Sequence, residues 1–105
     1  MQLGSNRFSE KRIDERIPVF HRTRAVGPGG QPLSLVIVDL SASGLMARCD
    51  YKLPAGAPIQ ITLPAIGVHS AMVRWSLGGR MGCELDEPIS LENYYELLTA
   101  LTRES

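Results

Sequence analysis

The chain of 105 residues is long enough for one compact domain with a single core and too short for a second lobe. It is 44% hydrophobic and 21% charged, which is ordinary for a water-soluble domain. No stretch approaches the apolar length of a membrane span and the polar first residues lack the apolar core of a signal peptide, so we expect no membrane segment and a cytoplasmic location.

The net charge of zero hides an uneven distribution of charge along the chain. Residues 7–24 carry six basic and three acidic side chains, whereas residues 84–105 carry six acidic side chains against Arg103 alone. A basic segment on a neutral domain favours an anionic partner of limited size. We expect neither DNA nor RNA, because long nucleic acids normally require a more basic surface and more aromatic side chains.

The chain begins with polar, unpatterned sequence. We assign residues 1–11 to a flexible N-terminal arm and residues 12–105 to one domain. Short segments of strand character follow, separated by turns rich in Gly, Pro and Ser. The predicted strands are residues 17–26, 33–40, 44–51, 59–64, 68–75 and 81–87. Six short strands with frequent turns indicate an antiparallel barrel or a sandwich.

Two of these strands contain cysteine, Cys49 and Cys83. Their spacing is not that of a CxxC motif, and for a cytoplasmic chain we expect buried free thiols rather than a disulfide or a metal site. In the third strand the alternation of side chains should place Leu45, Ala47 and Cys49 on one face. The opposite face should then carry Met46, Arg48 and Asp50.

The period changes from two to that of a helix near the end of the chain. Apolar side chains at helical spacing predict a helix over about residues 90–103. The predicted apolar stripe consists of Leu91, Tyr94, Tyr95, Leu98 and Leu101. Ser90 can cap the helix and Glu92 suits its first turn. We expect the stripe to cover an open barrel end or another subunit.

The segment "RIDER" places Arg12 and Arg16 four residues apart, just before the first strand. A guanidinium group can hold phosphate with two hydrogen bonds and can stack on a base, so this pair could grip one anion. The plainer interpretation is an exposed charge cluster in which the arginines pair with Asp14 and Glu15.

The segment "DLSASG" ends the second predicted strand. Asp39 and Ser41 should leave that strand on the same side, and a carboxylate can accept two N–H donors, as the edge of guanine offers. Gly44 permits a positive φ or a close backbone approach. The alternative is an Asx or Ser turn that simply closes a hairpin.

In this order and spacing, "RIDER" and "DLSASG" resemble the RxxxR and D/NxSxxG motifs of the PilZ domain, a bacterial receptor module for cyclic di-GMP. The segment "AMVRWSLGGRMGCEL" is similar to the late hairpin of that family, and the resemblance covers about residues 10–100. It implies a mainly β fold: a six-stranded antiparallel barrel with a C-terminal α-helix and a ligand site on the barrel's outer surface.

The resemblance also implies the roles of the site residues. Arg12 and Arg16 would hold phosphate and contact guanine, Asp39 and Ser41 would read a guanine edge, and Gly44 would let the turn approach the ligand. Lys11 stands where many members carry another arginine; it keeps the charge without the planar fork, and we include it as an optional contact.

The implied function is that of a receptor or adaptor that changes shape or surface on binding cyclic di-GMP and signals to a downstream protein. The alternative within the family is an adaptor that acts through protein partners without the ligand. We expect neither an enzyme nor a further cofactor, because no catalytic motif is present and Ser41 and Ser43 lack a GxSxG context. His21 and His69 lack the neighbours of a metal site.

Overall fold

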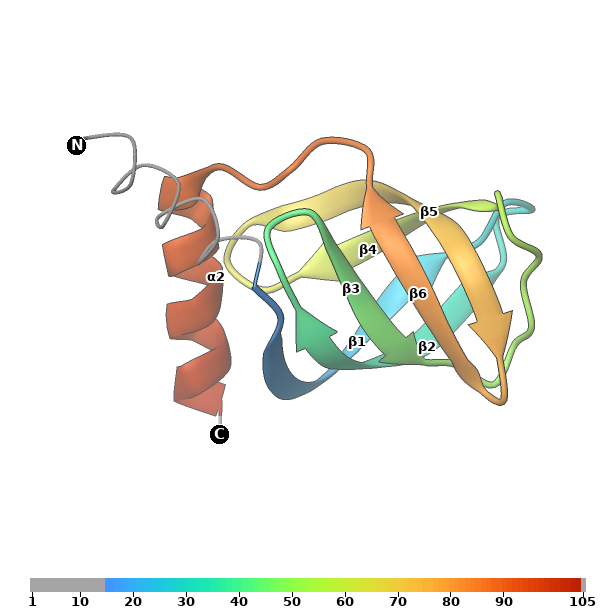
Figure 1. Ribbon diagram of the computed structural model, residues 1–105, viewed down its shortest axis with the longest axis horizontal. Coiled ribbons are helices and arrows are strands. Elements are labelled where there is room, and N and C mark those ends of the chain that lie inside the picture. The colour runs from blue at the N-terminus through green and yellow to red at the C-terminus, as the bar shows by residue number, and fades with distance from the viewer. Residues whose placement is uncertain (1–14, 105) are drawn as a thin grey trace.

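The computed structural model describes residues 15–104, which form six strands and a C-terminal helix (Figure 1). The strands are β1 (Ile17–Val26), β2 (Pro32–Leu40), β3 (Gly44–Arg48), β4 (Pro58–Leu63), β5 (Gly67–Leu77) and β6 (Arg80–Leu85), and the helix is α2 (Leu91–Glu104). All six predicted strands are present with shifts of one or two residues at most ends. Within this part of the chain, no helix has the length and apolar character needed to cross a membrane.

The strands form a closed antiparallel barrel in the order β1-β2-β3-β6-β5-β4. A short pairing between β1 and β4 closes it, with Ala25 opposite Ile61 and Val26 opposite Gln60. Closure removes the unpaired edges that an open sheet would expose. The barrel expected from the family resemblance is therefore confirmed, and the sandwich is not formed.

Alternation of side chains along the strands separates the core from the outer surface. In β4, for example, Ile59, Ile61 and Leu63 are buried, while the residues between them face solvent. The predicted alternation of the third strand is also confirmed, since Leu45, Ala47 and Cys49 are buried.

The strand β3 ends at Arg48 instead of continuing to Tyr51, as the sequence had predicted. The N–H of Cys49 still donates to the carbonyl of Gly79 at 2.9 Å. Beyond that point β6 has already turned back through Gly78 and Gly79, whose φ angles are 62° and 79°. Two central residues with positive φ are typical of a type I′ hairpin, and this turn leaves residues 50 and 51 without a partner strand.

The helix α2 lies across one end of the barrel (Figure 1). Ser90 caps it as predicted, because its Oγ accepts a hydrogen bond from the N–H of Asn93 at 3.2 Å. Tyr94 and Leu97 are buried in the core, and Leu98 and Leu101 pack against it.

The predicted apolar stripe was wrong in part. Leu91 and Tyr95 are 48% and 60% exposed, whereas Leu97, absent from the predicted stripe, is fully buried. The buried positions follow Tyr94 by three, four and seven residues, which defines a single helix face. Leu91 and Tyr95 lie outside that face.

Candidate functional site

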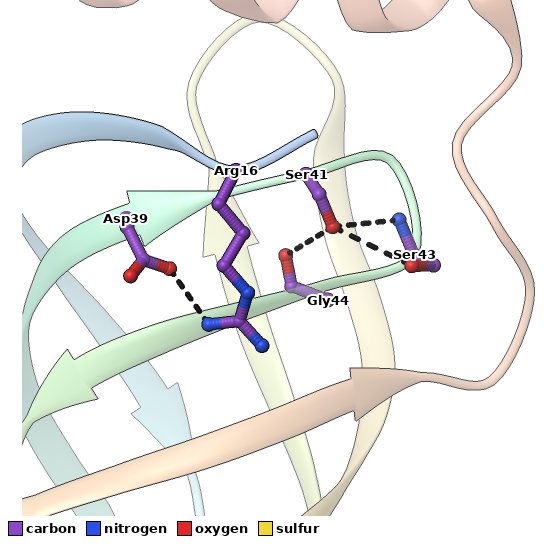
Figure 2. A network of polar contacts seen from close by, with 5 residues as sticks. All are labelled: Arg16, Asp39, Ser41, Ser43 and Gly44. Carbon is purple, nitrogen blue, oxygen red and sulfur yellow. Dashed lines mark hydrogen bonds and ion pairs between the residues drawn. The ribbon is translucent and has the colours of Figure 1, made fainter. Parts of the chain in front are cut away.

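The turn between β2 and β3 is held by the side chain of Ser41. The Ser41 hydroxyl donates to the carbonyl of Gly44 at 3.3 Å and accepts from the N–H of Ser43 at 3.3 Å. The backbone N–H of Ser41 also donates to Gly44 at 2.8 Å, and Ser41 is only 5% exposed. The turn-closing interpretation of this serine therefore describes its contacts in the free protein (Figure 2).

Gly44 is required by a close backbone approach and not by its φ angle. A Cβ atom at this position would lie 2.5 Å from the carbonyl oxygen of Cys83 on β6, whereas Gly44 is not among the glycines with positive φ. The sequence allowed either a positive φ or a close backbone approach at Gly44, and the structure shows the close approach. The approach it shows is to the neighbouring strand β6.

Arg16 and Asp39 form an ion pair at the start of β1 and the end of β2. The Arg16 Nη1 atom lies 3.0 Å from the Asp39 Oδ1 atom, and Figure 2 shows the arginine extending beside the β2–β3 turn. Arg16 thus pairs with a residue 23 positions away and not with the adjacent Glu15.

These residues border a shallow cleft of about 320 Å³ on the outer surface of β3, β6 and β5. Its lining combines residues of the turn with residues from the late hairpin. The lining residues are Arg16, Ser41, Ser43, Gly44, Arg74, Trp75, Gly82, Cys83 and Glu84. Asp39 stands beside the cleft through its contact with Arg16.

Trp75 forms part of the wall of this cleft and is 42% exposed, although the sequence favoured a core or rim position for it over a place in the site. Its indole ring lies so close over Gly82 that a Cβ atom there would clash with Nε1. A register shift between Val73 and Trp75 turns the tryptophan to the outer surface. The available sequence signal was a glycine, Gly82, in the strand following the tryptophan.

Arg74 and Glu84 face each other across β5 and β6 in the same cleft. Their Nη1 and Oε1 atoms are 2.9 Å apart, and both side chains are more than half exposed. Arg16 and Arg74 therefore bring two guanidinium groups to the cleft, against the carboxylates of Asp39 and Glu84. An incoming anion would compete with these carboxylates for the arginines.

The turn is also connected to the segment that leads into α2. The N–H of Leu85 donates to Ser43 at 2.9 Å, and the N–H of Ile89 donates to Ala42 at 2.8 Å. The turn is therefore hydrogen-bonded both to the end of β6 and to Ile89, the residue that precedes the helix cap.

Both cysteines are buried and free, as predicted. Burial raises the pKa of Cys83 to about 12, with a smaller contribution from nearby Cys49. At neutral pH, Cys83 is therefore a neutral thiol under the cleft and a poor nucleophile.

Two predicted site residues, Arg12 and the optional Lys11, lie outside the described residues, as does the arm over residues 1–11. Arg16, Ser41 and Gly44 meet at the cleft with Asp39 beside them. The cleft is also lined by four residues that were not predicted as site residues: Ser43, Arg74, Trp75 and Glu84.

Comparisons with known proteins show the family and the fold of the chain. A family model described as PilZ domain matches residues 7–104. Among solved structures, the chain is similar to the PilZ domain of CeSA from a cellulose-synthesizing bacterium, with a TM-score of 0.62 and 19% identity over 86% of this chain and 97% of the other. No curated protein matches the sequence.

Proposed function

Since the chain belongs to the PilZ domain family, a family of cyclic di-GMP receptor modules, we propose that it binds cyclic di-GMP at the cleft beside the β2–β3 turn and signals the bound state to a partner protein. The observation that carries the proposal is the meeting of Arg16, Asp39, Ser41 and Gly44, from two motifs 23 positions apart, at one place on the outer surface.

The chemistry of the cleft suits a guanine dinucleotide. Arg16, together with Arg12 from the preceding segment, would bind a phosphate and stack on a base. The Asp39 carboxylate would accept the two N–H donors of a guanine edge once Arg16 turns toward the ligand. Trp75, which is 42% exposed and lines the same cleft, would offer an aromatic ring to a base.

Ser41 would serve the site in a different way from Asp39. Its hydroxyl already bonds to Ser43 and Gly44, and its side chain is almost fully buried. We assign it mainly to holding the turn, with a ligand hydrogen bond available if the hydroxyl rotates. Ser43, which is half-buried and lines the cleft, presents a second hydroxyl.

The output of binding would pass through the hydrogen bonds between the turn and the approach to α2. Ligand contacts at Ser41 and Ser43 would bias the position of Ala42, whose carbonyl accepts from Ile89. A ligand can shift a conformational equilibrium only by binding its two states with different affinity. The proposed receptor performs no catalytic step.

Isothermal titration calorimetry of the full chain with cyclic di-GMP tests the proposal. We expect saturable binding, and far weaker binding of cyclic di-AMP, GTP and GMP. If a high concentration of cyclic di-GMP gives no heat of binding, the result would instead support an adaptor that acts without the ligand.

A further inference from the structure

A second hollow, larger than the cleft, lies on the outer face of β1, β2 and β3. Its volume is about 490 Å³, and it shares no lining residue with the cleft. It is lined by Arg22, Thr23, Arg24, Ser34, Leu35, Val36, Arg48, Cys49 and Asp50. We call it the arginine groove.

The strand register explains how the groove forms. Val36 of β2 lies opposite Arg22 of β1 on one side and opposite Arg48 of β3 on the other. Arg24 lies opposite Ser34 in the neighbouring row. The short outward side chains of β2 therefore make a floor, and long arginine side chains on both adjacent strands make the walls.

The positive charge continues beyond the groove, because Arg48 is also directly opposite Arg80 of β6. Like charges opposite each other in an antiparallel pair destabilise the sheet. Within residues 15–104, neither these two arginines nor Arg22 and Arg24 form an ion pair, although Asp50 also lines the groove. Among the described residues, four exposed arginines therefore have no carboxylate partner that would explain their place in the fold.

We propose that the arginine groove binds an acidic segment of a partner protein. Arginine forks hold carboxylates with paired hydrogen bonds, and arginine and aromatic side chains are enriched in protein interfaces. Exposed Phe20 adjoins the groove, with the Arg22 guanidinium carbon 5.8 Å from its ring centre. The exposed arginine walls make an open surface, unlike the enclosed sites that bind small molecules.

A protein partner fits these observations better than a nucleic acid. The chain has a net charge of zero and few aromatic side chains, whereas proteins that bind a long phosphate backbone normally carry a basic surface and aromatic stacking residues. The proposal does not depend on cyclic di-GMP binding, since the groove and the cleft are built from different residues.

Fluorescence anisotropy with a dye-labelled peptide of ten glutamates, at low ionic strength, tests the proposal on the full chain. We expect the peptide to bind and the Arg22→Gln/Arg48→Gln variant to lose at least about tenfold in affinity, since each substitution removes a charge-assisted hydrogen bond. Arg16→Gln/Arg74→Gln, which removes two positive charges outside the groove, should change affinity for this peptide by less than about twofold. Equal binding by wild type and the double variant would overturn the proposal.

Two further measurements test whether the arginines of the groove serve the fold or a nucleic acid instead. Arg48→Glu should weaken peptide binding and raise the melting temperature, because it places an acid opposite Arg80. A lower melting temperature would show that Arg48 stabilises the fold, against the proposal.

Tighter binding of a labelled ten-nucleotide thymidine strand than of the peptide would also overturn the proposal. Calorimetry should show cyclic di-GMP affinity of the double variant within about twofold of wild type, so that the two sites are judged independently.

Discussion

Arg16 and Asp39 are joined across the start of β1 and the end of β2, with 3.0 Å between Nη1 and Oδ1. The strand register brings them together: Pro18 lies opposite Asp39 and Ile17 opposite Leu40, so the chain before β1 emerges beside Ser41. Arg16, the last residue of the first motif, therefore lies beside the second motif in the free protein. The pair also occupies one carboxylate oxygen of Asp39, so binding of a guanine as proposed would require the pair to open.

Substitution of Arg16 should separate a ligand contact from a surface ion pair. Because the Arg16 side chain is 56% exposed, the pair with Asp39 contributes only about 0–1 kcal/mol to the free energy of unfolding, and Arg16→Ala should barely change thermal stability. A charge-assisted ligand contact is worth roughly 1.5–3 kcal/mol, so cyclic di-GMP affinity should fall about tenfold to hundredfold by calorimetry. Arg12→Ala should show a loss of the same order.

A second variant at the same position, Arg16→Lys, keeps the positive charge but removes the planar guanidinium group and its stacking face. We expect it to bind much more weakly than wild type. Affinity equal to that of wild type would mean that the site needs only a positive charge at this position.

Asp39→Ala should abolish discrimination between guanine and adenine. Without the carboxylate, cyclic di-GMP loses its acceptor and should approach the weak affinity of cyclic di-AMP, while the circular dichroism spectrum of the barrel stays unchanged. Titration of both dinucleotides into both proteins provides the comparison. The role assigned to Asp39 fails if wild type binds the two dinucleotides equally.

Gly44→Ala should destabilise the barrel, because the new methyl group would lie 2.5 Å from the Cys83 carbonyl oxygen and the two strands must separate. Overpacking of this kind costs typically about 1–3 kcal/mol, measurable by urea unfolding. Gly29→Ala is the matched control: its φ is not positive, and only the flexible side chain of Gln31 lies nearby. Similar losses in both variants would show that strand approach at Gly44 is not the cause.

Trp75 is the single tryptophan of the chain, so its fluorescence reports on the cleft directly. Cyclic di-GMP should shift or quench its emission, because a ligand in the cleft changes the exposure of the ring. In Gly82→Ala the indole must leave its position over β6, and its emission should shift toward longer wavelength without ligand. Emission unaffected by saturating ligand would place the ligand away from Trp75.

Two measurable predictions follow from the burial of the Cys83 thiol. Because the pKa of the buried Cys83 thiol is about 12, this thiol should react very slowly with an aromatic disulfide reagent at pH 8 in the folded protein. In urea, where the chain is unfolded, the same thiol should react rapidly. The native thiol also keeps its proton between about pH 9 and 12 while the unfolded thiol loses it. The free energy of unfolding should therefore fall as pH rises through this range, by up to about 1.4 kcal/mol per pH unit for one group.

The Cys83→Ala variant provides the control for both measurements. Its slope of stability against pH above about pH 9 should be shallower than that of wild type, with the remaining slope arising in part from Tyr94, whose pKa burial also raises. An unchanged slope would contradict the assignment to Cys83.

Local pattern alone determined most of the architecture. Alternation of apolar residues located the six strands, paired glycines at 78 and 79 marked a tight hairpin, and Ser90 marked the start of the helix. These signals are read from the sequence because they depend on neighbours within a few positions. The order of two short motifs also indicated the family and the position of the candidate site.

The tertiary structure decided which residues share that site. Trp75 reaches the cleft through a register shift in β5, and Arg16 meets Asp39 through the pairing of β1 with β2. Leu97 is buried, and Tyr95 exposed, by the way that α2 crosses the barrel end. Each of these facts depends on contacts between segments far apart in the chain. Local periodicity cannot supply them, because it specifies which face of a strand or helix is apolar but not what lies against that face.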